Sequence, residues 1–117
     1  MISLVFDIRP IPWSRTLRGE KSKRKKRQDE YIKALAIALK IVAEGETFDG
    51  AVKAELRFDY KHGRTLIRLS DMSHRPDLKT TRADCDNLVK IVLEAVQKSG
   101  IVKDDAQVAI IEAEKVG

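Results

Sequence analysis

The chain has 117 residues, which is the length of one compact domain and leaves no room for a second hydrophobic core. Its net charge is +5, but the excess is local. Residues 15–27 hold eight bases and one acid, whereas the other 104 residues carry a net charge of −2. This separation disfavours a protein coated uniformly in positive charge. It predicts a slightly acidic body, spanning one domain over residues 1–117, with a mobile basic arm at residues 15–27.

Composition excludes several other classes. Hydrophobic residues make up 43% of the chain, which is enough for a core and argues against disorder. Cys85 is the only cysteine, so no intrachain disulfide forms, which fits a reducing compartment. The N-terminal apolar run ends at Asp7 and is too short for a signal peptide. No apolar segment approaches the roughly 20 residues of a membrane span. We therefore expect a cytoplasmic protein that does not bind membranes.

The first predicted elements are a strand and a helix. Residues 2–9 favour a strand, and Pro10 and Pro12 interrupt regular structure after it. Residues 28–44 predict an amphipathic helix, because apolar side chains recur there at three- and four-residue spacing. This stripe consists of Tyr31, Leu35, Ala38, Leu39 and Val42.

A hairpin follows. Residues 51–60 alternate apolar and charged side chains, which predicts a strand with one buried and one wet face. The apolar positions are Val52, Ala54, Leu56, Phe58 and Tyr60. A turn at residues 61–64 and a shorter strand at residues 65–70 complete the hairpin.

The rest of the chain predicts a loop at residues 71–83, a helix at residues 87–98 and a last strand at residues 107–115. The apolar stripe of the helix consists of Leu88, Val92 and Ala95, with Val89 and Val96 beside it. The element order is then βαββαβ. We expect an α/β (α+β) fold in which two helices flank a mixed four-stranded sheet.

The residues with the clearest chemistry surround the second helix. Asp84 and Asp86 are two residues apart where the helix begins, so their side chains can point the same way. Lys90 lies one turn beyond Asp86 on the same face. Asp104 and Asp105 follow the other end of the helix, and only the fold can bring them to the first pair. Each residue also has an ordinary interpretation: Asp86 as a helix N-cap, Lys90 as a solvated side chain, and Asp104–Asp105 as loop residues.

Three converging carboxylates would form an oxygen-only site, which suits Mg²⁺ or Mn²⁺ and not Zn²⁺. Such a cation would polarise a phosphoryl group and activate water, while a lysine offsets developing charge. The spacing does not fit an EF-hand, because Val89 and Ala95 occupy the glycine and glutamate positions. His62, His74 and the lone cysteine do not have zinc-ligand spacing.

The two blocks together resemble the RusA-type Holliday junction resolvases. They are Asp84-x-Asp86-Asn87-Leu88-x-Lys90 and Asp104-Asp105-Ala106-Gln107-Val108. The early strand, the proline-rich turn and the basic arm are also similar to that family. The close resemblance covers residues 82–108, and a looser one covers nearly the whole chain.

The resemblance implies a Mg²⁺-dependent, structure-selective endodeoxyribonuclease that resolves four-way junctions or other branched DNA in recombination and repair. It also implies a homodimer, often encoded by a phage or prophage of a bacterial cell. By position, Asp84, Asp86 and Asp105 match the metal-binding and catalytic carboxylates, and Lys90 matches the catalytic lysine. We expect DNA contacts from Arg15, Arg18, Lys21, Lys23, Arg24, Lys25, Lys26, Arg27 and Arg82.

The chain departs from the family pattern in two places. Ala83 stands where the family usually has a basic residue or proline before the first aspartate. Residues 61–81 look like an insertion, and Asp77 within it follows Arg75 and Pro76 in an imitation of the motif. We prefer Asp84 as the first ligand, because Asn-Leu and the helix follow only Asp84-x-Asp86.

A non-catalytic nucleic-acid binding protein that uses the basic arm is the alternative function. Trp13, next to the arm, fits either a core position or a DNA contact. Aromatic content of 5% offers little surface for stacking single-stranded bases.

Overall fold

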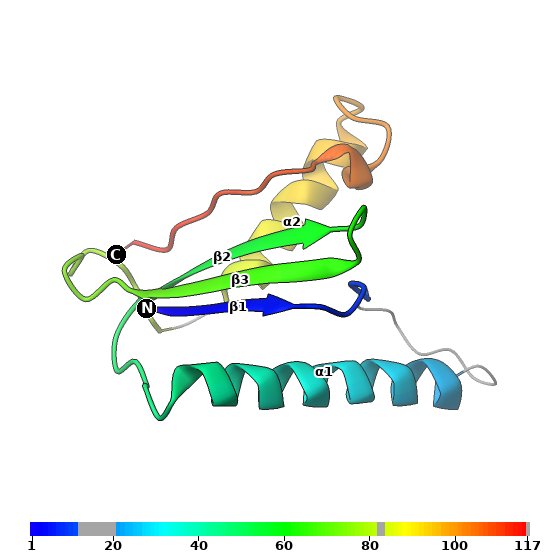
Figure 1. Cartoon of the computed structure of the whole chain (residues 1–117). Coiled ribbons are helices and arrows are strands. Elements are labelled where there is room, and N and C mark those ends of the chain that lie inside the picture. Colours follow the sequence, from blue (N-terminus) through cyan, green and yellow to red (C-terminus); the bar gives the residue numbers. More distant parts are fainter. Residues whose placement is uncertain (12–20, 82–83, 117) are drawn as a thin grey trace. The chain divides into compact units, whose positions relative to one another are not determined.

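The structure of the chain is a computed structural model that describes residues 1–11, 21–81 and 84–116. The backbone falls into two compact units, Met1–Ser73 and His74–Gly117. The first unit holds a sheet and a long helix, and the second holds a shorter helix and a single 3₁₀ turn (Figure 1). In the described part of the chain, neither helix has the length and apolarity that crossing a membrane requires.

The sheet has three antiparallel strands in the order β1-β3-β2. They are β1 (Ile2–Phe6), β2 (Val52–Asp59) and β3 (Arg64–Asp71). The two outer strands pair on either side of β3, so they run parallel to each other without touching. The central strand therefore lies inside the segment that the sequence suggested was an insertion. The predicted hairpin is confirmed, with its strands paired from Val52–Asp71 to Asp59–Arg64.

One face of the sheet carries the core. Residues directly opposite each other in an antiparallel ladder point to the same face. One such row consists of Phe6, Thr65 and Phe58, and the next consists of Leu4, Ile67 and Leu56. On this face Phe6 of β1 is buried, and so are Thr65 and Ile67 of β3. The opposite face carries charged side chains on β2 and β3.

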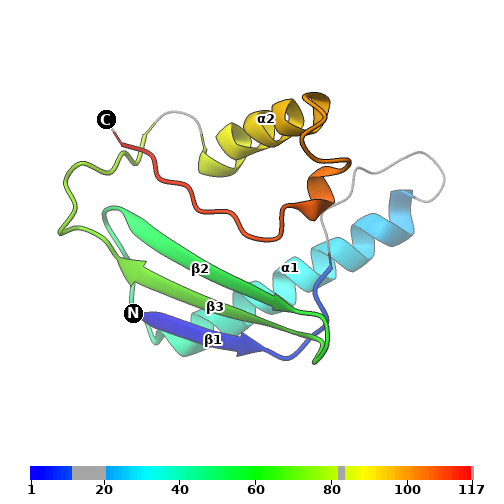
Figure 2. The same ribbon diagram turned by 90° about the horizontal axis from the view of Figure 1, so that it is seen from above.

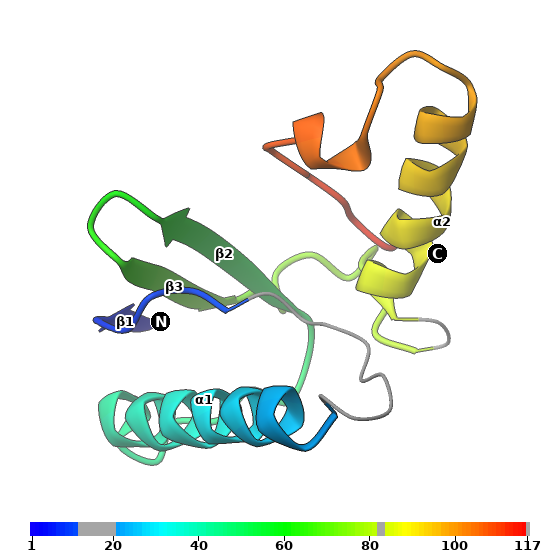
Figure 3. The same cartoon turned by 90° about the vertical axis from the view of Figure 1, so that its right-hand side faces the viewer.

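Helix α1 (Lys21–Ala43) covers the core face along β1, as Figures 1 and 3 show from two directions. Tyr31 from the predicted stripe contacts Phe6 edge to face, with ring centroids 5.5 Å apart. Its hydroxyl lies 3.5 Å from the Thr65 hydroxyl. Leu35, Leu39 and Ala38 are also partly buried, whereas Val42 is exposed. The stripe is thus confirmed except at its last position.

The helix begins at Lys21, seven residues before the start that the apolar stripe predicts. The intervening residues are lysine, arginine and serine, and lysine and arginine are good helix formers that carry no apolar periodicity. The segment 21–27 is therefore helical and not the loop that its charge suggested. Residues 12–20, which hold Trp13, Arg15 and Arg18, lie outside the described residues.

Helix α2 (Cys85–Lys98) begins two residues earlier than predicted. Its predicted stripe is wrong in detail, because Leu88 is 46% exposed and Val92 61% exposed. The side chains that the second unit partly covers are instead Cys85, Val89, Leu93 and Val96. This set also has helical spacing, so periodicity alone offered two stripes.

The predicted fourth strand at residues 107–115 is wrong, and the described sheet is purely antiparallel and not mixed. The 3₁₀ turn η1 (Asp105–Gln107) occupies its beginning. The remaining segment makes a bridge between Val116 and Leu78, beside a hydrogen bond from the Lys79 amide to the Lys115 carbonyl. Ile110 is 81% exposed there. A β-branched sequence favours extended backbone, but a strand also needs a neighbouring edge with which to pair.

Candidate functional site

The first acidic pair lies at the N-terminus of α2. Asp84 occupies the N-cap position with extended backbone, yet its side chain makes no capping hydrogen bond. Asp86 lies in the first turn, so the N-cap interpretation of Asp86 is wrong. Both side chains are exposed. The usual structural reason for an aspartate at this position, satisfaction of a free helix amide, therefore does not account for Asp84.

Lys90 follows Asp86 by one turn of the helix. Its side chain is exposed, and no ion pair joins it to Asp86 or to another described residue. A lysine and an aspartate at this spacing can pair on a helix surface. The start of α2 thus presents two carboxylates and one ammonium group, all accessible and none held in an ion pair by the residues that the structure describes.

The second acidic pair is built differently. Asp104 caps η1: its carboxylate accepts a hydrogen bond from the Ala106 amide at 3.0 Å. The Gln107 side chain completes the capping box by accepting from the Asp104 amide at 3.2 Å. The Asp105 amide donates to the Gln97 side chain at 3.1 Å. These bonds fix Asp104 and Asp105 beside the last turn of α2.

The carboxyl groups of Asp104 and Asp105 interact directly. A hydrogen bond between them raises the pKa of Asp105, and partial desolvation and the negative charges of Asp104 and Glu94 raise it further. The Ala106 amide and the same hydrogen bond lower the pKa of Asp104. The titrations of these two carboxyl groups are therefore coupled, and a cation bound beside them would lower the pKa of both.

The two acidic pairs lie at opposite ends of α2, and all three ribbon views place η1 at the C-terminal end of this helix (Figures 1, 2 and 3). Asp86 and Gln97 are eleven residues apart in the helix, which corresponds to about 16 Å along its axis. The oxygens around one Mg²⁺ lie only about 2.1 Å from the ion. Among the described residues, no three acidic, histidine or cysteine side chains gather closely enough to hold a metal.

The carboxylate oxygens of the two acidic pairs are therefore of the kind that Mg²⁺ prefers, but the two pairs lie too far apart to bind one ion together. Asp84 and Asp86 come together as one pair, and Asp104 and Asp105 as another. Bringing Asp105 to the first pair within one chain requires its hydrogen bond to Gln97 to break.

Asp77, the competing first ligand, is already engaged. Both of its carboxylate oxygens accept hydrogen bonds from the Arg75 guanidinium, at 3.0 and 2.6 Å. This contact lowers the pKa of Asp77. Arg75 also binds Glu114, at 3.3 Å. Arg75 thus joins Asp77 in the loop to Glu114 in the C-terminal segment of the second unit, which gives Asp77 a structural role.

The described part of the basic segment forms the first turns of α1. Lys23, Lys25, Lys26 and Arg27 are exposed there, and the first turn contains no acidic residue. Helical spacing places Lys23 and Arg27 on one face. The side chain of Lys21 and all of Arg15, Arg18 and Arg82 lie outside the described residues.

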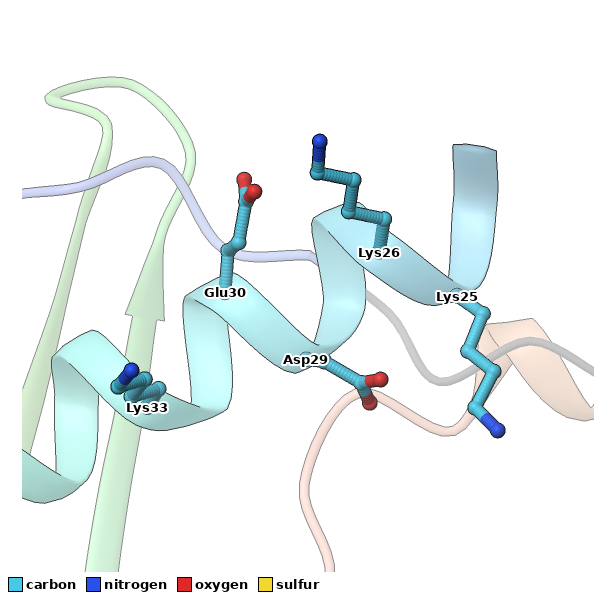
Figure 4. Close-up of a pocket in the computed structure, with 5 residues that line it drawn as sticks. All are labelled: Lys25, Lys26, Asp29, Glu30 and Lys33. Atoms are coloured by element: carbon cyan, nitrogen blue, oxygen red, sulfur yellow. The ribbon is translucent and has the colours of Figure 1, made fainter. Parts of the chain in front are cut away.

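A shallow hollow of about 330 Å³ opens along the same helix (Figure 4). It is lined by Lys25, Lys26, Asp29, Glu30 and Lys33. Lys25 and Asp29 point to one side of the helix in Figure 4, and Lys26 and Glu30 to the other. The acids offset part of the positive charge here, so Lys23 and Arg27 are the more effective cations for a phosphate.

Two residues that surround the second acidic pair were not identified from the sequence. Gln97 holds the Asp105 backbone, and Glu94 adds negative charge near the Asp105 carboxyl. The turn itself had a signal in the sequence, because an aspartate followed three residues later by glutamine is a capping-box pattern.

Comparison with known proteins identifies the family. The model of the family described as "Endodeoxyribonuclease RusA" matches residues 8–117, which include the basic segment and both acidic pairs. No curated protein and no solved structure matches the chain. Because the family model spans nearly the whole sequence, this chain belongs to the RusA endodeoxyribonuclease family.

Proposed function

We propose that the protein is a Mg²⁺-dependent, structure-selective endodeoxyribonuclease that resolves Holliday junctions or other branched DNA as a homodimer in a bacterial or phage-infected cell. The observation that carries this function is the start of α2. There Asp84, Asp86 and Lys90 are exposed and form no ion pair with another described residue, within a family of endodeoxyribonucleases. A two-fold dimer with one site in each subunit matches a substrate in which two strands are cut symmetrically.

The basic turns of α1 bind the phosphate backbone in this proposal. Lys23, Arg27 and their neighbours supply affinity without reading sequence, because phosphate contacts carry no base information. The amides at the N-terminus of α2 attract phosphate oxygens as well. Asp84 and Asp86 repel phosphate on their own, so productive binding at that end of α2 requires a cation.

Mg²⁺, or Mn²⁺ in its place, would polarise the phosphoryl group and lower the pKa of a bound water. We assign Asp84 and Asp86, which lie together at the start of α2, as its ligands because hard carboxylate oxygens suit these ions. Asp105 is the third ligand in this proposal, and it joins them only when its backbone hydrogen bond to Gln97 breaks. Lys90 stabilises the negative charge that develops on the phosphoryl oxygens during cleavage. Asp105 would bind as a carboxylate, and a cation beside it would oppose the causes that raise its pKa.

A four-way junction assay tests this function. Wild-type protein should nick a labelled junction symmetrically with Mg²⁺ and leave it intact in EDTA. Asp84→Asn should reduce cleavage at least about 100-fold while junction binding, measured by fluorescence anisotropy in Ca²⁺, changes little. Asp49→Asn is the matched control, because Asp49 is an exposed aspartate of the first unit, outside both acidic pairs.

Asp77→Asn discriminates between the two possible first ligands and should leave cleavage intact. Cleavage that survives Asp84→Asn and is lost in Asp77→Asn would move the ligand to Asp77. A wild-type protein that binds junctions and cuts no branched substrate with Mg²⁺ or Mn²⁺ would instead establish the non-catalytic binding function.

A further inference from the structure

β2 is an edge strand with an unusual combination of exposed side chains. It pairs with β3 on one side, and among the described residues no strand pairs with its other side. An open edge presents backbone N–H and C=O groups that can extend the sheet into another chain. Proteins usually protect such an edge with lysines, prolines or bulges, and β2 carries one lysine, Lys53, but no proline or bulge.

The apolar side of β2 lies on the core face of the sheet but is uncovered. Leu56 is in the same row as buried Ile67, and Phe58 is in the same row as buried Phe6. Even so, Leu56 is 55% exposed and Phe58 56% exposed. α1 covers the β1 side of this face and leaves the row on β2 open.

The charged side of β2 alternates in sign. In chain order it carries Lys53, Glu55, Arg57 and Asp59. Asp59 is bound by His62 and Arg64 within the hairpin. Lys53, Glu55 and Arg57 form no ion pair among the described residues. When two copies of this strand run antiparallel, each positive side chain can therefore lie opposite a negative one of the other copy.

We propose that β2 pairs antiparallel with β2 of a second copy of this chain, in the register that places Leu56 opposite Leu56 on the two-fold axis. Glu55 of each copy then lies opposite Arg57 of the other, and Lys53 lies opposite Asp59. On the core face, Phe58 of each copy lies opposite Ala54 of the other, so a large side chain meets a small one. The two sheets join into one continuous six-stranded sheet.

Charge selects this register over its neighbours. A shift of two residues in one direction sets Lys53 opposite Arg57 and Glu55 opposite its own copy. The same shift in the other direction sets Glu55 opposite Asp59 and Arg57 opposite its own copy. Like charges directly opposite each other destabilise a strand pair. A shift by one residue would place apolar side chains opposite charged ones on both faces.

The inference deepens the proposed function by naming the surface of its homodimer. The two are nonetheless separable, because the dimer is measured by mass and the nuclease by cleavage. A dimeric protein without nuclease activity would contradict only the function, and an active protein whose dimer survives changes on β2 would contradict only the interface.

The experiment reverses the charge of single side chains on β2 and measures the dimer by sedimentation velocity of the full chain. Wild type should sediment at twice the 13.2 kDa mass of the chain. Arg57→Glu sets a glutamate opposite Glu55 twice in each dimer, so its dimer dissociation constant should rise at least about tenfold. Glu55→Arg should do the same. An equimolar mixture of the two variants restores both opposite-charge pairs and should recover the dimer.

Lys61→Glu is the matched control, because it makes the same change of charge on an exposed residue of the same hairpin outside β2. Glu55 also lies opposite Arg68 on β3, so thermal unfolding must show that Glu55→Arg is folded. Leu56→Lys provides a second route, since it places two lysines on the two-fold axis and should give monomers. A monomeric wild type, a dimer unaffected by Arg57→Glu and Leu56→Lys, or a mixture of folded variants that stays monomeric would overturn the proposal.

Discussion

The acidic residues of the second unit differ in what holds them. Asp84 and Asp86 form no ion pair or cap among the described residues, whereas Asp104 and Asp105 are fixed by a capping box and by Gln97. Their interaction also raises the pKa of Asp105 and lowers that of Asp104. The two ends of α2 therefore hold their aspartates differently, even though both carry a pair of them.

Asp104→Asn should lower the pKa of Asp105. An asparagine amide donates a hydrogen bond to the Asp105 carboxylate and carries no charge, so both contributions of Asp104 to the raised pKa are removed, while desolvation and the charge of Glu94 remain. Carboxyl carbon shifts in an NMR pH titration measure this directly. Asp86→Asn is the control and should leave the pKa of Asp105 unchanged, because about 16 Å of helix separates Asp86 from Gln97. An equal effect of Asp86→Asn would contradict that separation.

The same pair makes stability depend on pH. Because folding raises the pKa of Asp105, protonation of Asp105 favours the folded state, and this contribution is fully present below the ordinary pKa of an aspartate. That contribution is lost as the pH rises through the raised pKa of Asp105. Asp104 has a lowered pKa and acts in the opposite direction, with its contribution lost as the pH falls through that value.

Among the elements, the sheet shows how an alternating strand distributes burial. Neighbouring residues of β1 point to opposite faces, and only one of these faces packs against α1. Phe6 is 6% exposed and contacts Tyr31, whereas Val5 is 55% exposed. The contribution of β1 to stability is therefore concentrated on alternate residues.

Phe6→Ala should lower the free energy of unfolding by about 3 kcal/mol, because it leaves a cavity and removes the edge-to-face contact with Tyr31. Val5→Ala, one residue earlier, should lower it by less than about 1 kcal/mol. Urea unfolding of both variants gives the comparison. Equal losses would show that the face assignment of β1 is wrong.

The sequence predicted most helices and strands correctly, but it predicted less well which of their side chains are buried and which strands pair. Alternation along residues 51–60 correctly indicated β2, but alternation does not say whether the apolar face is covered, and Leu56 is exposed. Helical spacing indicated α2 but did not distinguish Leu88 from Leu93 as the covered side chain. The last strand failed because the preference of Ile110 for extended backbone is local, whereas a pairing partner is a property of the whole fold. The same limit applies to the site: spacing predicted two acidic pairs, but only the fold shows that α2 separates them.

At the scale of the whole molecule, positive and negative charge are concentrated on different elements. The described cations of residues 21–27 are gathered on the first turns of α1, and the second unit carries the candidate carboxylates. Under the proposed function, this division would let a chain with a net charge of only +5 bind a polyanion at one place while another place requires a cation.

Lys23→Gln with Arg27→Gln should weaken junction binding and reduce the slope of log K against log salt concentration by about 2. Glutamine keeps the helical propensity of α1 high, so the change is mainly one of charge. Lys33→Gln with Lys40→Gln removes the same charge further along α1 and should change the slope by less. Anisotropy titrations at several salt concentrations measure both. Identical slopes for the two variants would show that the first turns of α1 do not contact phosphate.

The early start of α1 has a thermodynamic consequence. Its first turns place cations at the positive end of the helix dipole, and burial begins only at Gln28, with Tyr31 contacting Phe6 of the sheet one turn later. These turns are therefore the weakest part of the helix in the free protein, and bound phosphate would neutralise both the dipole and the mutual repulsion of the cations. Binding and helix formation are then linked equilibria, so that DNA which occupies these turns also stabilises the helical form that presents them.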